Sequence, residues 1–187
     1  MTDVVRPFTQ KAAAVLLALA ATGCASAMTV GSHVDRRVDF ARYTRYDWGP
    51  ADRLPAGDPR LDRNPSFGDR VQGAIERQLA AKGLVLVADA SEPPDLIIHY
   101  HATITERMEV GRFEEVYGSN VKGGRAEIVR FEAGTLILDV VDAATGRLIW
   151  RGWAQRAVAD LLNDPDRMAS AVDEAVARMM KRFPRRL

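Results

Sequence analysis

The stretch that decides the fold is Gly134-Thr135-Leu136-Ile137-Leu138-Asp139-Val140-Val141-Asp142, then Ala143-Ala144-Thr145-Gly146, then Arg147-Leu148-Ile149-Trp150-Arg151-Gly152-Trp153. Two runs rich in apolar, β-branched and aromatic residues flank a short turn that ends in glycine. This pattern is typical of two antiparallel strands joined by a tight turn. We therefore expect a β-hairpin over residues 134–153.

The segments on either side of this hairpin extend the pattern. Upstream, apolar residues alternate with polar ones over 96–105, which predicts a strand with one buried face. Downstream, Asp164 can cap a helix whose first turn contains Pro165 and which ends before Pro184. Its apolar residues recur at helical spacing, which predicts a buried stripe formed by Met168, Val172, Val176, Met179 and Phe183.

The first half of the chain contains a second helix. Asn64 can cap it, Pro65 fits its first turn, and Gly83 ends it. Its predicted buried stripe contains Phe67, Val71, Ile75 and Leu79. Around this helix we expect a strand over about 36–48, a loop over 49–65 and a short buried strand over 84–87. The charged, glycine-rich region 106–132 is interpreted as strand ends around a long connection.

These elements follow one another in the order β-α-β-β-β-β-α, without internal repeats. Such an order is most simply satisfied by an α+β fold, a mostly antiparallel sheet with two helices packed on one face. We expect a single domain over 36–187, preceded by a small, polar tether over 24–35 and by a signal peptide over 1–23.

The N-terminus has the features of an export signal. Arg6 and Lys11 precede an uncharged apolar run over 12–21. The run is shorter than the roughly 20 residues that span a bilayer, which favours its removal. It ends in Gly23-Cys24, which resembles the lipobox of bacterial lipoproteins, although Ala21 stands where leucine is usual. The alternative is cleavage by an ordinary secretory peptidase after Ala25-Ser26-Ala27.

Cleavage before Cys24 would leave a mature chain whose only cysteine is acylated. Multiple acyl chains hold a protein stably on a membrane. Resemblance to lipoprotein sorting in enteric bacteria implies that Ala25, in place of Asp after the cysteine, directs the protein to the outer membrane, facing the periplasm. The mature chain has equal numbers of acidic and basic side chains. This balance argues against a nucleic-acid partner, which requires many Lys and Arg contacts to phosphate.

Several segments together resemble a known family. They are the lipobox, the helix end over 79–83, the string Pro94-Asp95-Leu96-Ile97-Ile98-His99-Tyr100, the hairpin over 134–152 and Arg182-Phe183-Pro184. In this order they resemble family 4136 of the domains of unknown function. The resemblance implies a location in the cell envelope, as a lipoprotein, and the architecture of the domain. From the chain as a whole we expect a structural, binding or assembly-accessory role, with the membrane and an unidentified envelope protein as partners. The resemblance implies no catalytic residue and no cofactor.

His99 and His101 are the strongest candidates for chemistry. Residues at i and i+2 of a strand share a face, so both imidazoles can approach one metal ion. Zinc requires at least a third ligand. The only other histidine, His33, lies in the predicted tether, so Glu106 or another residue of the 106–132 region would have to supply it. The competing interpretation is two polar residues on the less buried face of a strand. Motifs for nucleophilic catalysis and phosphate binding are absent, which favours a role other than catalysis.

Tryptophans provide a second kind of candidate site. Trp48 and Trp153 are candidate binding residues, because exposed aromatic rings mark recognition surfaces. The competing interpretation is that strand aromatics lie in the core. Trp150 and Trp153 are three residues apart, which places them on opposite faces of a regular strand, and we expect Trp153 to be the exposed one. An apolar cleft between sheet and helices is a third possibility, for which a concave pocket would be needed.

Overall fold

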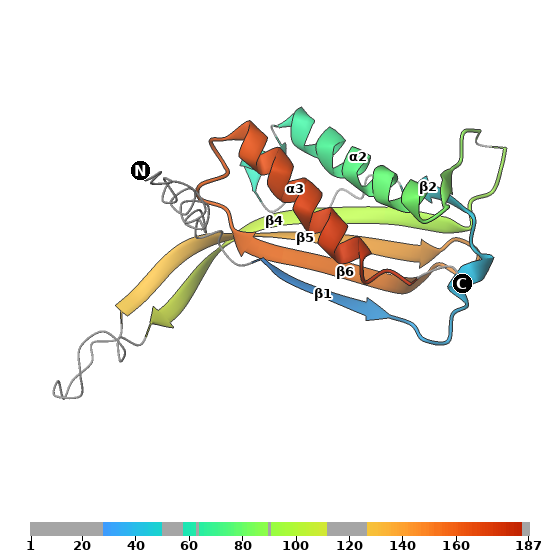
Figure 1. Cartoon of the computed structure of the whole chain (residues 1–187), viewed down its shortest axis with the longest axis horizontal. Coiled ribbons are helices and arrows are strands. Elements are labelled where there is room, and N and C mark those ends of the chain that lie inside the picture. Colours follow the sequence, from blue (N-terminus) through green and yellow to red (C-terminus); the bar gives the residue numbers. More distant parts are fainter. Residues whose placement is uncertain (1–27, 50–57, 63, 90, 112–126, 185–187) are drawn as a thin grey trace, which may run out of the picture.

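The computed structural model describes residues 28–49, 58–62, 64–89, 91–111 and 127–184 (Figure 1). A six-stranded sheet has the strand order β1-β6-β5-β4-β2-β3. Helices α2 and α3 cover one of its faces, which confirms the predicted α+β class. The strands are β1 (Thr29–Val34), β2 (Arg45–Trp48), β3 (Val85–Leu86), β4 (Leu96–Gly111), β5 (Glu127–Asp142) and β6 (Arg147–Ala157).

The predicted hairpin is formed by β5 and β6. Gly146 occupies the left-handed region at φ 67° and its N–H donates to the Asp142 carbonyl at 2.8 Å, which closes the turn. The register shifts between Val140 and Val141, where β6 contains one extra residue. This bulge allows the consecutive residues Ile149 and Trp150 both to be buried.

The sheet is antiparallel from β1 through β6 and β5 to β4, and parallel from β4 through β2 to β3. The alternation predicted for 96–105 is confirmed, with Leu96 and Ile98 almost fully buried beneath the helices. The sheet is therefore mixed but mostly antiparallel, as expected.

Both predicted helices are confirmed, together with their caps. The Asn64 side chain accepts from the Phe67 N–H at the start of α2 (Pro65–Ala81), and the Asp164 side chain accepts from the Arg167 N–H at the start of α3 (Pro165–Met180). Gly83, at φ 77°, ends α2. Apolar stripes of both helices pack against the sheet in one cluster, which includes Val71, Ile75, Leu79, Leu138, Trp150, Val176, Met179 and Phe183.

The predicted tether requires a correction. Residues 29–34 form strand β1, whose six residues all pair with β6, from Thr29 opposite Gln155 to Val34 opposite Trp150. Val30 and Val34 pack against the core, but the small and polar residues between them hide the alternation in the sequence. The folded domain therefore begins before residue 36. The predicted signal peptide over 1–23 lies outside the described residues.

Three other elements differ from their predicted bounds. The strand expected over 36–48 is only β2, over Arg45–Trp48, because the Asp39 side chain accepts a hydrogen bond from the Ala41 N–H and starts a 3-10 turn, η1 (Phe40–Arg42). A short helix, α1 (Pro59–Asp62), lies within the predicted loop. The strand expected to be buried over 84–87 is the exposed edge strand β3, with Val85 62% and Leu86 38% exposed.

Candidate functional site

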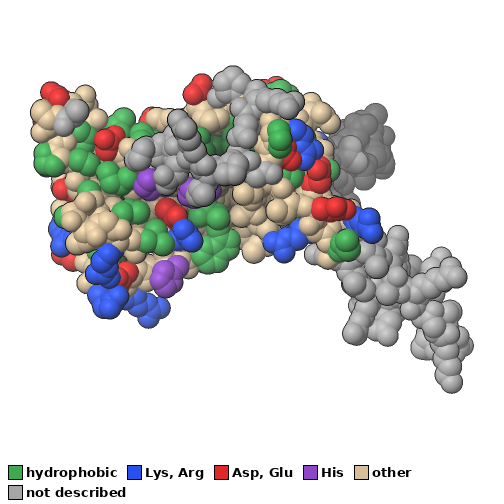
Figure 2. All heavy atoms as spheres, turned by 180° about the vertical axis from the view of Figure 1, so that it is seen from behind, with side chains coloured by type: hydrophobic (Ala, Val, Ile, Leu, Met, Phe, Trp, Pro, Cys, Tyr) green, Lys and Arg blue, Asp and Glu red, His purple; other side chains and the backbone are tan. Residues whose placement is uncertain are grey.

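The face of the sheet opposite the helices carries a row of four polar side chains. The strand registers place His33, Arg151, Asp139 and His99 directly opposite one another across β1, β6, β5 and β4. From behind, the molecule shows histidine, arginine and carboxylate side chains beside one another (Figure 2). This polar row and the next row along the strands form the candidate site, which we call the open face.

An ion pair fixes the middle of the polar row. Arg151 Nε donates to Asp139 Oδ1 at 2.6 Å, and Arg151 Nη2 donates to Asp139 Oδ2 at 2.5 Å. This two-point geometry is both strong and directional. Asp139 is only 6% exposed, and its hydrogen bonds raise the pKa of the Arg151 guanidinium. The pair therefore links β5 and β6 across this face at two points.

His99 and His101 lie on the open face as the i and i+2 residues of β4, as expected. The His99 ring lies across Gly49, where an added Cβ would be 2.0 Å from the His99 Cε1 atom. His33 belongs to β1 and not to a tether, but three strand spacings separate it from His99, about 14 Å. Glu106 also belongs to β4 but lies on the face opposite to that of His99 and His101. Among the described residues, no three His, Cys, Asp or Glu side chains are grouped as metal ligands.

Trp153 occupies the next row of the open face. His101, Ile137, Trp153 and Gly31 are aligned there across β4, β5, β6 and β1. A Cβ on Gly31 would lie 2.1 Å from the Trp153 Cζ2 atom, so the glycine leaves the space in which the indole lies over β1. Trp153 is 36% exposed and Trp150 is fully buried, which confirms the predicted difference between them.

Trp48, the other candidate, packs on the helix side of the sheet. Its Nε1 donates to Glu76 Oε1 of α2 at 3.0 Å, and its ring meets the Tyr100 ring edge-on with centroids 6.2 Å apart. It belongs to the border of the core. Trp48 and Trp153 therefore lie on opposite faces and do not form a shared aromatic platform.

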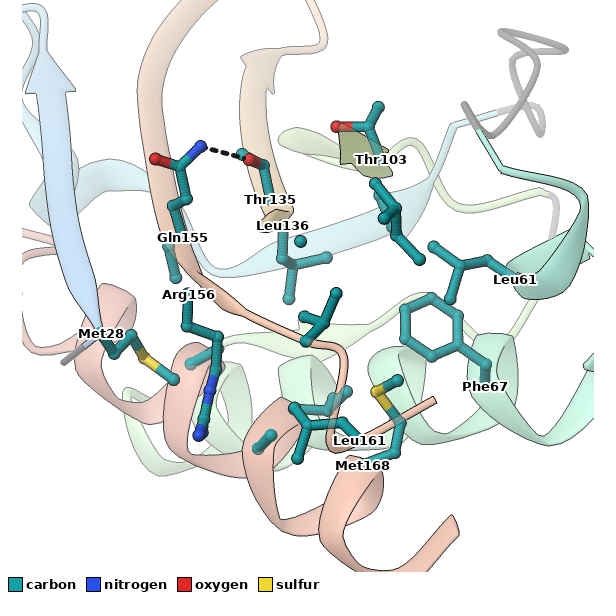
Figure 3. A pocket seen from close by; sticks show the side chains of 18 residues that line it. Met28, Leu61, Phe67, Thr103, Thr135, Leu136, Gln155, Arg156, Leu161 and Met168 are labelled. Carbon is teal, nitrogen blue, oxygen red and sulfur yellow. Dashed lines mark hydrogen bonds between the residues drawn. The ribbon is translucent and has the colours of Figure 1, made fainter. Parts of the chain in front are cut away.

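A pocket lies between the helices and the sheet (Figure 3). Its volume is about 60 Å³ and its walls are almost entirely apolar. The space results from small residues on facing elements, namely Ala102, Gly134, Ala154, Ala171 and Ala175. The sequence shows these residues individually, but only the tertiary structure brings them together.

One charged side chain lines this pocket. Arg156 of β6 has a side chain that is 16% exposed, and its Nη1 lies 3.9 Å from Glu174 Oε2 of α3. The pocket therefore combines apolar walls with a partly buried positive charge. Sequence analysis did not single out Arg156, because it is one of many basic residues in the chain.

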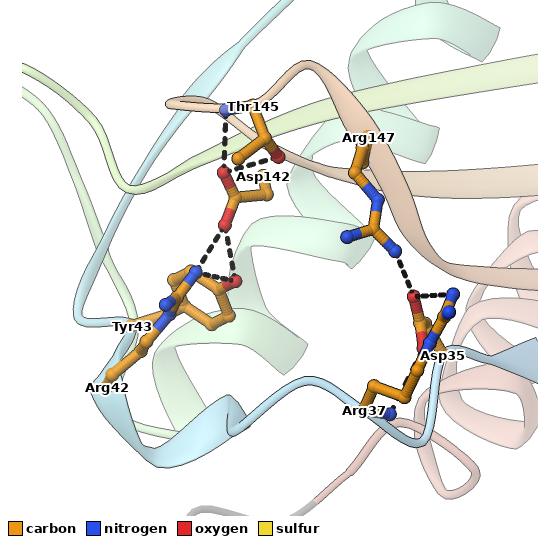
Figure 4. Close-up of polar contacts among 7 residues, drawn as sticks. All are labelled: Asp35, Arg37, Arg42, Tyr43, Asp142, Thr145 and Arg147. Atoms are coloured by element: carbon orange, nitrogen blue, oxygen red, sulfur yellow. Dashed lines mark hydrogen bonds and ion pairs between the residues drawn. The ribbon is translucent and has the colours of Figure 1, made fainter.

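Two buried or half-buried carboxylates fix the end of the sheet near the β5–β6 turn (Figure 4). Asp142 accepts hydrogen bonds from the Tyr43 hydroxyl and from Arg42 Nη2, each at 2.6 Å, and from Thr145 N and Oγ1, each at 2.9 Å. These donors, the Tyr43 hydroxyl above all, hold the pKa of Asp142 well below its usual value.

The second carboxylate, Asp35, directly follows β1, which is separated from β5 by β6. Asp35 accepts from Arg37 Nε at 3.1 Å and from Arg147 Nη2 at 2.6 Å. Hydrogen bonds from Arg37 are the largest cause of the lowered pKa of Asp35. Together the two carboxylates tie the hairpin turn to the segments on either side of η1, which is a structural role.

The fold and its sequence define the class of the protein. The family model described as a domain of unknown function, DUF4136, matches residues 30–185. The chain belongs to this family, and the match includes β1 as well as the final helix. No curated protein matches. Among the described residues, no helix is both long and apolar enough to cross a membrane.

Solved structures with a similar fold are distant in sequence. A PDZ domain protein from Parabacteroides distasonis matches with a TM-score of 0.51 and 17% identity over 84% of this chain and 36% of that one. A PelC dodecamer from Paraburkholderia phytofirmans matches with a TM-score of 0.50 and 13% identity over 86% of this chain and 100% of that one. This chain thus spans little more than a third of the first protein. Both similarities concern the fold alone.

Proposed function

We propose that this protein is a lipoprotein, acylated on Cys24, that holds a binding or assembly-accessory domain at the periplasmic face of the outer membrane. The observation that carries the proposal is the uncharged run over 12–21 that ends in Gly23-Cys24, only four residues before Met28. Met28 is already buried against the domain. The proposed lipid and the folded domain are thus separated by a very short segment.

The open face supports a role in binding. Trp153 presents part of a large aromatic ring on the same face of the sheet as His101 and the ion pair of Asp139 with Arg151. Exposed aromatic residues supply much of the binding energy at protein interfaces. We propose that an envelope protein docks here, with the ion pair and the histidines providing polar contacts around the indole.

Substitution of Cys24 tests the anchor. In a Gram-negative host fed a palmitate analogue, we expect the wild-type chain to be labelled and to be retained in the membrane fraction. Cys24→Ala should lose both label and retention, because no other cysteine is present to accept the lipid. Ala27→Leu is the matched control, because it blocks the alternative cleavage after Ala27 and leaves Cys24 intact. A wild-type chain without label, released by cleavage that Ala27→Leu abolishes, would refute the anchor.

The pocket supports a second candidate function, binding of a small apolar ligand with an anionic group. Its apolar walls and Arg156 carry this alternative. We expect saturable binding of an anionic naphthalene dye, and Ala154→Leu should reduce it because the added carbons fill the pocket. Ala80→Leu, on the exposed side of α2, is the control. Equal binding by both variants would show that the dye binds elsewhere.

A further inference from the structure

Strands β4 and β5 continue beyond the rest of the sheet as an isolated ribbon (Figure 1). β6 is paired with β5 only as far as Ala133, which lies opposite Ala157. Beyond it, residues 106–111 pair with 127–132, and no described residue forms a third strand beside them. We call this ribbon the arm. Over its six residue steps it extends about 20 Å.

The base of the arm is braced, but the arm itself has no described partner. Arg60 Nη2 of α1 lies 2.7 Å from Glu132 Oε1. Arg60 also donates hydrogen bonds to Asp58, and these bonds lower the pKa of Asp58 to about 2. Beyond this brace, a two-stranded ribbon is marginally stable in water and has unpaired backbone groups along both edges. A surface that covered the arm would therefore stabilise it.

The composition of the arm indicates the chemistry of that surface. Met108 is 59% exposed, and Arg107 and Arg130 are exposed beside it. The arm also contains four glutamates, namely Glu106, Glu109, Glu127 and Glu132. An exposed methionine flanked by two arginines suits the boundary between lipid headgroups and acyl chains, where arginine meets phosphate and methionine meets hydrocarbon.

The direction of the strands brings the arm and the proposed lipid to the same end of the domain. Thr29, the first residue of β1, lies in the row of Gln155, Thr135 and Thr103, three residues before the arm begins. The chain from Cys24 to Met28 spans at most about 14 Å. Acyl chains on Cys24 would therefore hold the base of the arm close to a bilayer.

We propose that the arm lies on the phospholipid surface to which Cys24 is anchored and serves as a second membrane contact that orients the domain. This inference rests on the proposed acylation of Cys24. The arm extends past the end of β6, away from the rows that form the open face and from the pocket. Both of these sites therefore remain accessible to other ligands when the arm lies on a membrane.

The test uses the full chain with Met108→Cys, purified from the host membrane and reconstituted in phosphatidylethanolamine and phosphatidylglycerol vesicles. In the acylated chain the Cys24 sulfur is blocked, so the introduced thiol alone reacts with an environment-sensitive maleimide dye. Val85→Cys is the matched control, because Val85 is equally apolar and exposed but lies on β3, at the far edge and far end of the sheet. We expect brominated phospholipids to quench the dye at position 108 several times more strongly than at position 85.

Each outcome has a distinct meaning. Equal, weak quenching at both positions in an acylated chain would overturn the proposed membrane contact of the arm while leaving the anchor intact. A wild-type chain that takes up no palmitate analogue would instead refute the anchor, and with it the basis of this inference. Adding Arg107→Gln and Arg130→Gln to Met108→Cys should weaken quenching if the arginines contact lipid phosphate.

Discussion

Replacing Asp142 with alanine is expected to lower the free energy of unfolding by about 3 kcal/mol, because it removes a buried acceptor and leaves the buried Tyr43 hydroxyl without its partner. Asp142 is 3% exposed and accepts from the Tyr43 hydroxyl and from both Thr145 donors. The ion pair with Arg42 contributes less, since the Arg42 side chain is 59% exposed. Urea denaturation followed by circular dichroism measures the change.

Asp173→Ala is the matched control for this substitution. Asp173 accepts from Arg70 and Arg77 between α2 and α3, but its side chain and both arginines are substantially exposed. Exposed pairs of this kind contribute well under about 1 kcal/mol. If Asp142→Ala is no more destabilising than Asp173→Ala, the hydrogen bonds of Asp142 do not have the structural role assigned to them.

The charge of Asp142 also predicts a dependence on pH. The pKa of Asp142 is lowered in the folded protein from its ordinary value of 3.8, chiefly by the Tyr43 hydroxyl. Its contribution is therefore fully present above about pH 4 and is lost as pH falls through the folded pKa. The stability difference between wild type and Asp142→Asn should be constant near neutral pH and should shrink in strong acid.

Trp150→Ala is expected to be at least as destabilising, with a loss of about 3–5 kcal/mol in the free energy of unfolding. Trp150 is fully buried, and its ring meets the Phe183 ring edge-on with centroids 5.2 Å apart. Its removal would leave a large cavity between β6 and the end of α3. The loss is comparable with the whole stability of many domains.

Trp153→Ala provides the comparison, because it makes the same substitution three residues along the same strand. Trp153 is on the open face and 36% exposed, so we expect a much smaller loss. Similar losses from both substitutions in urea denaturation would contradict the assignment of the two faces. Trp150→Phe should be milder than Trp150→Ala, since among the described residues the Trp150 Nε1 has no hydrogen-bond acceptor.

The elements predicted correctly from sequence are those with local signals. Asn64 and Asp164 cap their helices as expected, and the β5–β6 turn closes at Gly146. Each of these depends on residues within a few positions of one another. The strand β1 has no comparable signal, because Gly31, Ser32 and His33 interrupt its apolar residues and its stability comes from pairing with β6.

The same distinction applies to the candidate site. The shared face of His99 and His101 follows from the period of a strand, and the different exposures of Trp150 and Trp153 were predicted in the same way. The polar row was not predicted, because it joins residues from four strands. An apolar cleft between the sheet and the helices is one possibility that the sequence leaves open, but its position and lining depend on small side chains contributed by the sheet and α3.

The pairing of β1 with β6 has a consequence for the order of assembly. β1 is among the first segments to be synthesised, but its partner, residues 147–157, is produced only after most of the chain. Loop closure over such a separation is slow compared with formation of the β5–β6 hairpin. The outer strand thus completes the sheet only once the C-terminal third exists, and until then the segment next to Cys24 has no strand with which to pair.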